Sequence, residues 1–356
     1  MVGFIDFLSI LALSFGISVA LFGLLLPKDW VRNLYAEKRR DRDIHSDFKA
    51  RIGGLVIIPL FILGVMILMA VGWIPNDAKY WGMLVGALMV LGYGYWDEKK
   101  DLSWHIQLGV QVAIALVVVA SGIGIDAIMI PFGELVSLDI WNIGVGPVMV
   151  SLPADIISIL WIVGLMNVVN WLDGIDGLAG GVGVIGFGVL FVLAMTPFVG
   201  QVHIAILCAL LAGLYLGFLR FNWYPSKIFL GTYGSMFLGY IMGILAIVSG
   251  GKMATASLVF AFPILDAVSV ISQRLAAGQS IFQADNRHFH HKLLQLGLTQ
   301  RQAVGVMYGL SLIFGMSALV LQTRGKAIVF ALGAITLVGL SLGITWIVGN
   351  REAKSD

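Results

Sequence analysis

The chain has few charged residues: Asp, Glu, Lys and Arg make up 12% of its 356 residues, whereas hydrophobic residues make up 59%. So little polar surface excludes a water-soluble globule. Apolar runs repeatedly reach the roughly 20 residues that cross a bilayer. The composition therefore predicts an all-α, polytopic membrane protein, which we expect to form a single domain over residues 1–356.

The chain also has a single cysteine and no basic residues near its amino terminus. The single cysteine, Cys208, lies in an apolar run, which excludes an internal disulfide. No basic residue precedes the first apolar run, about residues 4–26, and no small-residue cleavage signal is evident after it. Secretory signal peptides carry both features, so we expect this run to be a retained first helix.

Apolar runs of spanning length predict eleven transmembrane helices, which puts the two termini on opposite sides. They lie near residues 4–26, 52–74, 79–95, 105–123, 155–171, 178–196, 202–220, 228–248, 255–273, 304–322 and 327–348. With the amino terminus outside, only Lys79, Lys252, Arg324 and Lys326 of the 22 Lys and Arg residues face outward. Positive charge gathers in cytoplasmic loops, so we expect the amino terminus outside and the carboxyl terminus in the cytoplasm.

One sizeable insertion, about residues 124–153, falls on the predicted outer side. Its apolar runs 127–131 and 145–152 are separated by turn-forming Gly and Pro residues. This pattern predicts a short external β-hairpin at the membrane surface. We assign it no chemistry.

Polar residues concentrate in the segment 167–181, between two long apolar runs. Asn167, Asn170, Asp173 and Asp176 recur there every third residue, interspersed with glycines. Neighbours at this spacing share a helical face, and glycines let the backbone approach a ligand closely. A solvated loop is the alternative reading. Because ionisable residues at a membrane edge are functional candidates by default, we place the centre of a site here.

A second acidic group, Asp97, Glu98 and Asp101, follows the third predicted helix on the same side. If the segment is helical, Asp97 and Asp101 lie one turn apart on one face. Alone it could be plain solvated charge. Together with the Asn and Asp residues of 167–181, it supplies carboxylates for a hard divalent cation.

Two further inner segments suit phosphate. The basic segment from Lys28 to Arg51 satisfies the positive-inside pattern, and beside a site it would also attract anionic lipid and nucleotide phosphates. The turn Gly231–Ser235 precedes an apolar run, where backbone N–H groups at a helix start can bind phosphate. Alone, this turn is weak evidence.

The longest inner loop, about 274–303, carries a cluster of cationic and imidazole side chains: Arg287, His288, His290, His291 and Lys292. A zinc site is one reading, but no cysteine accompanies the histidines. Hydrogen bonding to a nucleotide diphosphate and its sugar fits better. Nearby, Asp266 stands in an apolar run and therefore needs a partner.

All these groups converge on the predicted cytoplasmic face. A hard cation with positioned carboxylates at a lipid boundary is typical of phosphoryl transfer, where catalysis is mostly positioning and charge neutralisation. One substrate should then be lipid-borne and the other a soluble, phosphate-rich donor.

The motifs resemble those of the polyprenyl-phosphate N-acetylhexosamine-1-phosphate transferases (glycosyltransferase family 4). The resemblance rests on Asn167-x-x-Asn170-x-x-Asp173-Gly-x-Asp176-Gly-Leu-Ala, Asp97-Glu98-x-x-Asp101, Arg51-Ile-Gly-Gly54 and His288-x-His290-His291, in family order across nearly the whole chain. The histidine motif is closest to the undecaprenyl-phosphate α-N-acetylglucosaminyl 1-phosphate transferase branch. Phospho-N-acetylmuramoyl-pentapeptide transferase is a more distant member.

The resemblance implies transfer of N-acetylglucosamine 1-phosphate from UDP-N-acetylglucosamine to undecaprenyl phosphate, with release of UMP. It implies Mg²⁺, with Mn²⁺ as a substitute, a multi-pass protein of the bacterial inner membrane, and the initiating step of cell-envelope polysaccharide synthesis such as O-antigen. The partners implied are the two substrates and membrane lipid, without nucleic acid; a homodimer and the identity of the hexosamine stay open.

The resemblance also carries residue roles onto this chain. Asp97, with Glu98 and Asp101, would be catalytic, Asp97 acting on the lipid phosphate as base or nucleophile. Lys49 and Arg51 would bind that phosphate. The metal would be held by Asn170, Asp173, Asp176 and, at the position of a further ligand, Thr232. The nucleotide sugar would contact Asn167, Gly231, Gly234, Arg287, His288, His290 and His291.

Three positions depart from the family pattern. Thr232 stands where the family has a metal-ligating Asp, and offers only a neutral hydroxyl. Glu98 replaces the usual second Asp, and Ala50 replaces a proline before Arg51. Metal affinity and the start of the second helix are where we expect this chain to differ.

Two other functions compete with the transferase. A transporter or flippase for an anionic lipid or nucleotide sugar also uses membrane-edge charges, but its site lies at mid-membrane between repeats, and no inverted repeat is evident. A CDP-alcohol phosphotransferase needs an Ala-Arg pair after its Asp-Gly, which the sequence after Gly177 lacks.

Overall fold

The structure is a computed structural model that describes residues 3–28, 31, 49–130, 133–145, 148–197, 199–249, 253–279 and 288–352. The helices of its first half are α1 (Phe4–Leu25), α3 (Gly53–Ala70), α4 (Ala78–Lys100), α5 (Trp104–Ala120) and α6 (Ala154–Leu172). Those of the second half are α7 (Leu178–Met195), α8 (Val202–Asn222), α9 (Gly231–Val248), α10 (Met253–Val259), α11 (Ala261–Ala276), α12 (Phe289–Gln295), α13 (Gln300–Val320) and α14 (Thr323–Glu352).

Within these described ranges, eight helices are long and apolar enough to cross a bilayer: α1, α3, α6, α7, α8, α9, α13 and the first part of α14. Each has at least 18 predominantly apolar residues, and a segment in lipid is helical because a helix satisfies its own backbone groups. The protein is therefore a multi-pass membrane protein. The count of eleven spans and their orientation stay predictions.

The prediction of one unbroken ninth helix over 255–273 is wrong. The chain leaves the helix at Phe260, between the end of α10 at Val259 and the start of α11 at Ala261. Pro263 explains the break, because a proline inside a helix clashes with the carbonyl four residues earlier, here that of Val259.

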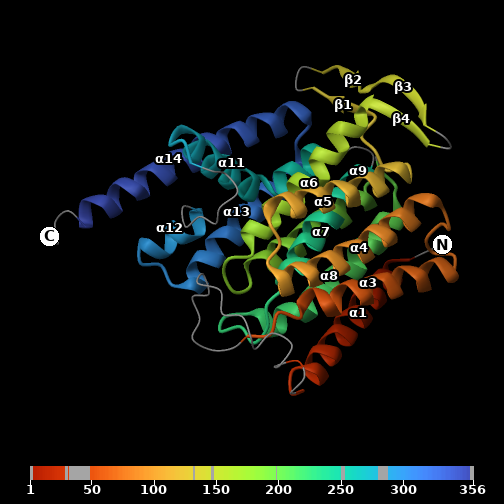
Figure 1. Cartoon of the computed structure of the whole chain (residues 1–356), viewed down its shortest axis with the longest axis horizontal. Helices are drawn as coiled ribbons and strands as arrows, with labels where there is room; N and C mark the ends of the chain where they lie inside the picture. Colours follow the sequence, from red (N-terminus) through yellow and green to blue (C-terminus); the bar gives the residue numbers. More distant parts are fainter. Residues whose placement is uncertain are drawn as a thin grey trace.

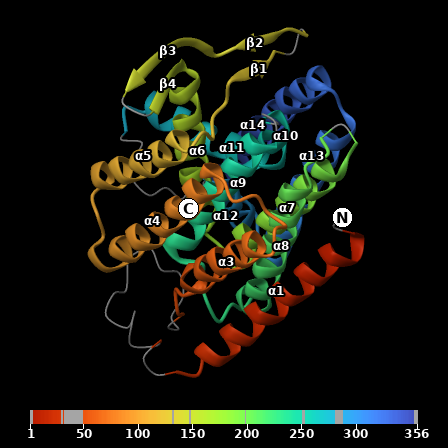
Figure 2. The same ribbon diagram turned by 90° about the vertical axis from the view of Figure 1, so that its right-hand side faces the viewer.

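The helices have two distinct ends. At the strand end, α5 leads into the strands and the last strand runs directly into α6. At the opposite end, called the acidic end below, α4 finishes with Asp97 and Glu98, and α6 finishes before Asp173. Figures 1 and 2 show the strands gathered across the strand end. The polar motifs of the sequence thus collect at the end remote from the strands.

The insertion forms two antiparallel hairpins rather than one. Strand β1 (Ala127–Met129) pairs with β2 (Leu135–Ser137), and β3 (Asp139–Val145) pairs with β4 (Val148–Pro153). The expected pairing of 127–131 with 145–152 is wrong, because each of these segments pairs with its immediate neighbour in the chain. Short connections favour such local hairpins.

Helix α9 lies at the centre of the bundle, packed against α3, α4 and α6. Its neighbours approach it closely where they carry glycine. A Cβ on Gly94 of α4 would lie 2.2 Å from the Cβ of Tyr233, and one on Gly54 would lie 2.4 Å from the ring of Tyr233. These contacts bring the ends of α3, α4 and α9 together at the acidic end.

We expect Gly94→Ala to destabilise the protein by about 1–3 kcal/mol, the usual cost of overpacking, because backbone and Cβ atoms of Tyr233 occupy the space for the new methyl group. Gly92→Ala is the matched control in the same helix, since its Cβ would meet nothing within 4 Å. The measurement is thermal unfolding in detergent. Equal melting temperatures for the two variants would contradict the close packing of α4 on α9.

Candidate functional site

The segment 167–181 forms a helix end, a turn and a new helix. Asn167 and Asn170 lie on α6, Asp173 caps its carboxyl end, and Asp176 lies in the turn before α7. Buried Asn222 holds this turn: its Oδ1 accepts the N–H of Gly177 at 2.9 Å, and its Nδ2 donates to the carbonyl of Ile228 at 2.8 Å. The turn is thereby fixed to the segment that leads into α9.

Asp173 is a buried carboxyl group whose ionised form is disfavoured. Desolvation raises the pKa of this carboxyl group to about 7; Arg51 opposes the rise, while the carboxylates of Glu98 and Asp176 add to it. A nearby divalent cation would reverse that repulsion.

Asp176 has a structural role in this arrangement. Its Oδ1 accepts from the hydroxyl of Ser226 at 2.8 Å, and its Oδ2 accepts from the N–H of Ser226 at 3.0 Å and from Lys49 Nζ at 3.2 Å. Lys49 also lies over the ring of Phe229, 5.0 Å from its centroid. The carboxylate therefore ties the α8–α9 connection and the segment before α3 to the turn.

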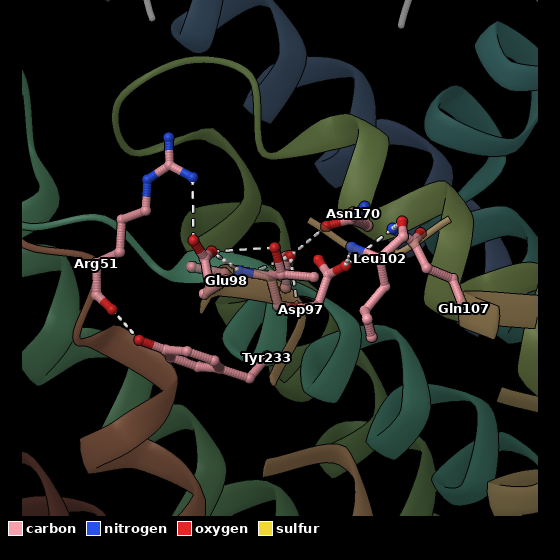
Figure 3. Close-up of polar contacts among 10 residues, drawn as sticks. Arg51, Asp97, Glu98, Leu102, Gln107, Asn170 and Tyr233 are labelled. Carbon is pink, nitrogen blue, oxygen red and sulfur yellow. Dashed lines mark hydrogen bonds and ion pairs between the residues drawn. The ribbon is translucent and has the colours of Figure 1, made fainter. Parts of the chain in front are cut away.

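The end of α4 presents two buried carboxylates, Asp97 and Glu98, only 3% and 6% exposed. Asp97 Oδ1 accepts from Gln107 Nε2 at 2.9 Å and from the N–H of Leu102 at 3.2 Å. Both residues follow α4 in the chain, so Asp97 is oriented by its own helical hairpin. Figure 3 shows Asp97 and Glu98 with their neighbours Gln107, Leu102 and Arg51.

Asp101 has a different environment from Asp97. Helix α4 ends at Lys100, and Asp101 has a left-handed backbone conformation with φ +53°. Its side chain is exposed. Asp101 is the residue that caps α4, one turn from Asp97: its N–H donates to the carbonyl of Asp97 at 2.8 Å, and its side chain is exposed where that of Asp97 is buried.

Glu98 joins three elements of the fold. One carboxylate oxygen, Oε2, lies 3.2 Å from the guanidinium of Arg51 before α3. The other, Oε1, accepts from the N–H and the hydroxyl of Thr232 at 2.8 and 3.0 Å. Thr232 thus contacts Glu98 through two hydrogen bonds that it donates.

The Gly-rich turn starts α9 at Gly231, which has φ +76°. Ser235 donates to Asn170 Oδ1 at 2.8 Å, and the hydroxyl of Tyr233 donates to the carbonyl of Arg51. Gly234 packs against Gly54, so that a Cβ on Gly234 would lie 2.9 Å from the Gly54 nitrogen. Hydrogen bonds from Thr232, Tyr233 and Ser235 thus connect the turn to Glu98, Arg51 and Asn170, respectively.

The histidine motif lies against the Asn/Asp turn. His288 Nδ1 lies 2.8 Å from Asp266 Oδ2, and the N–H of Phe289 donates to Asp266 Oδ1 at 2.9 Å. The expected partner of Asp266 is therefore His288. Arg287 lies outside the described residues.

His290 is the buried member of the histidine motif. Burial lowers the pKa of His290 well below its ordinary value, with His291 and His288 lowering it further. Its Nε2 has no hydrogen-bond partner among the described residues. A Cβ on Gly174 would lie 2.6 Å from that atom, so glycine is needed where the neutral imidazole meets the turn.

The described residues contain no group of three His, Cys, Asp or Glu side chains placed to hold a metal ion. The zinc reading of the histidines thus has no such group to support it. A hard cation fits the chemistry of Asp173, whose charge needs neutralising, with the Asn170 amide oxygen as a further oxygen donor. Asp176, held by Lys49 and Ser226, fits this role less well.

Several residues that orient the site escaped the sequence motifs. Besides Asn222 and Ser226, these are Gln107 and Gln111, four residues apart on α5. Gln111 is buried and exchanges hydrogen bonds with Asn167, accepting from its Nδ2 at 2.6 Å. Two glutamines four residues apart in an apolar helix share one face. This spacing is the sequence feature that could have indicated a polar contact of α5 with the site.

Comparisons with known proteins agree on one family. The family model of glycosyl transferase family 4 matches residues 80–250. A probable undecaprenyl-phosphate N-acetylglucosaminyl 1-phosphate transferase of Bacillus subtilis is 32% identical over 80% of this chain and 76% of its own length. Decaprenyl-phosphate N-acetylglucosaminephosphotransferase of Mycobacterium tuberculosis is 30% identical over 85% of this chain and 80% of its own length. A phospho-N-acetylmuramoyl-pentapeptide-transferase of Methylacidiphilum infernorum is 28% identical over 75% of this chain and 77% of its own length.

We expect Asp173→Asn to raise the melting temperature at pH 8 in the presence of a chelator. The folded pKa of about 7 exceeds the ordinary 3.8, so the folded parent loses stability as the pH rises from about 4 to above 7. Asn mimics the neutral acid and avoids that loss. The gain should therefore shrink from pH 8 to pH 5; a gain independent of pH would contradict the raised pKa.

Proposed function

This chain belongs to glycosyl transferase family 4, and we propose that it transfers N-acetylglucosamine 1-phosphate from UDP-N-acetylglucosamine to undecaprenyl phosphate. The products are UMP and the lipid-linked diphosphate sugar. The relatives from Bacillus subtilis and Mycobacterium tuberculosis carry N-acetylglucosamine and polyprenyl phosphate in their names, the latter with a decaprenyl chain. The hexosamine and the lipid length are therefore the finer parts of the proposal.

The observation that carries the proposal is the meeting of Asp97 and Glu98 with Asn170 and Asp173 at the acidic end. In the proposed reaction, an oxygen of the lipid phosphate attacks the sugar-bearing phosphorus of the donor, and the bond to the UMP oxygen breaks. Asp97 would accept the proton of the lipid phosphate or orient that phosphate, because its carboxylate is held in one orientation by Gln107. Attack by Asp97 itself is the alternative route.

The remaining residues would bind and neutralise. Arg51 and Lys49 lie beside the carboxylates with cationic groups suited to lipid phosphate, and the histidine motif would bind the donor. Mg²⁺, with Mn²⁺ as a substitute, would be held by Asp173 and Asn170 with Asp176 nearby, and would supply neutralisation of the diphosphate charge.

Membrane placement is part of the proposal. We place the acidic end in the cytoplasm and the strand end outside, in the bacterial inner membrane, because the inner loops collect the basic residues. The product would initiate a cell-envelope polysaccharide such as O-antigen. The site lies at helix ends rather than at mid-helix, which favours a transferase over a transporter.

The test is release of UMP by purified protein given undecaprenyl phosphate and UDP-N-acetylglucosamine, with Mg²⁺ or with a chelator. We expect metal-dependent UMP from the parent and a loss of at least about a hundredfold in Asp97→Asn, the scale of general acid–base catalysis. Thermal unfolding of both proteins checks that the variant is folded.

Asp101→Asn is the matched control, because Asp101 is exposed outside α4. We expect it to keep more activity than Asp97→Asn. Absence of UMP from the folded parent with every UDP-sugar tried would reject the proposed reaction.

We expect Thr232→Asp to make stability depend on divalent cations. The new carboxylate would stand within hydrogen-bonding distance of Glu98 Oε1, where Thr232 now donates two hydrogen bonds. Like-charge repulsion lowers the melting temperature in chelator, and Mg²⁺ between the two carboxylates restores it.

Thr232→Val is the control, since it loses the hydroxyl donor without adding charge. It should be destabilised equally with and without Mg²⁺. Thermal unfolding against Mg²⁺ concentration measures both variants. A Mg²⁺ response of Thr232→Asp no larger than that of the parent would show that this position does not face the cation.

A further inference from the structure

The β3–β4 hairpin has one apolar face and one more polar face. The register pairs Trp141 with Leu152 and Ile143 with Val150. Paired residues point to the same side, and successive residues point to opposite sides. Trp141, Ile143, Val150 and Leu152 therefore form one surface, called the apolar hairpin face.

The opposite face begins one residue along each strand. It carries Asn142 and Ser151, whose side chains share a hydrogen bond of 2.6 Å, and the pair of Gly144 with Met149. Among these four residues only Met149, which is 63% exposed, has a large apolar side chain; Ile140 lies at the register shift before Trp141 and is assigned to neither face. The hairpin is thus amphipathic.

The β3 side of the apolar hairpin face is exposed, whereas Val150 and Leu152 on β4 are partly buried. Trp141 is 66% exposed and Ile143 is 51% exposed. Large apolar groups left in water forfeit roughly 25 cal/mol per Å² that burial would contribute. An exposed apolar surface of this kind marks an interaction site.

The position of the hairpin identifies its environment. Strand β4 runs into α6 without a linker, and α6 is apolar and long enough to cross the bilayer. Ile156 and Leu160, in the first two turns of α6, are both exposed as lipid-facing residues are. In both views the hairpin lies across the helix ends rather than continuing along them (Figures 1 and 2). It therefore lies at the level where the lipid-facing surface ends.

The charge of the insertion indicates how it would contact a membrane. Residues 127–153 contain Glu134 and Asp139 but no Lys or Arg, so the insertion itself offers no positive charge to anionic headgroups. Tryptophan prefers the boundary between headgroups and acyl chains. We propose that the apolar hairpin face is inserted into this boundary of the membrane leaflet at the strand end, with Asn142 and Ser151 turned to water.

The test compares two adjacent positions on opposite faces. In a Cys208→Ala background, Ile143→Cys and Asn142→Cys are each labelled with an environment-sensitive fluorophore and reconstituted in phosphatidylcholine vesicles. Nitroxide on the lipid acyl chains reports contact with the bilayer, and a water-soluble nickel chelate reports contact with solvent. Because Cys208 is buried, the parent background serves if the alanine variant does not fold.

We expect the label at 143 to show blue-shifted emission and quenching by the nitroxide lipid, and the label at 142 to be quenched by the nickel chelate. Equal access of both labels to the nickel chelate would overturn the proposal. Shielding of the label at 143 from both quenchers would also overturn it, in favour of a protein partner or a second copy of this chain. Neither outcome depends on the proposed transferase activity.

Discussion

The contacts of the Glu98 carboxylate are the interaction on which the acidic end depends. One oxygen meets Arg51 before α3 and the other meets Thr232 at the start of α9, while Glu98 itself lies in the last turn of α4. The start of α3, the end of α4 and the start of α9 are thereby fixed at one point. Hydrogen bonds that involve a charged group are stronger than neutral ones, and this one lies where burial excludes most water. The placement of Asp97, one residue earlier, follows from it.

The carboxylates of the acidic end differ in their ion pairing. Asp176 is paired with Lys49, and Glu98 with Arg51, whereas burial raises the pKa of Asp173 to about 7, and the carboxylates of Glu98 and Asp176 add to that rise. The two paired carboxylates connect helices and turns of the acidic end. Asp173 differs from them, because its ionised form is disfavoured by burial and by its acidic neighbours.

Much of this arrangement could be predicted from the sequence. Long apolar runs determined the helices, since backbone groups in lipid have no other partner, and the clustering of Asn170, Asp173 and Asp97 at one end followed from counting spans. The partners of the individual carboxylates could not be predicted. Asp176 meets Ser226, and Asp97 meets Gln107, through tertiary contacts that no local spacing contains. Strand pairing failed for a related reason: apolar runs identify strands but not their neighbours.

The histidine motif is attached to a different element from the carboxylates. Both His288 and the backbone of Phe289 hydrogen-bond to Asp266 on α11, whereas the carboxylates belong to α4 and the end of α6. The break at Phe260 separates α11 from α10, so α11 is set independently of the helix before it. The histidine motif therefore links α11 to the turn after α6, because His290 packs against Gly174 of that turn. A displacement of α11 would be passed through the imidazoles to the backbone beside Asp173.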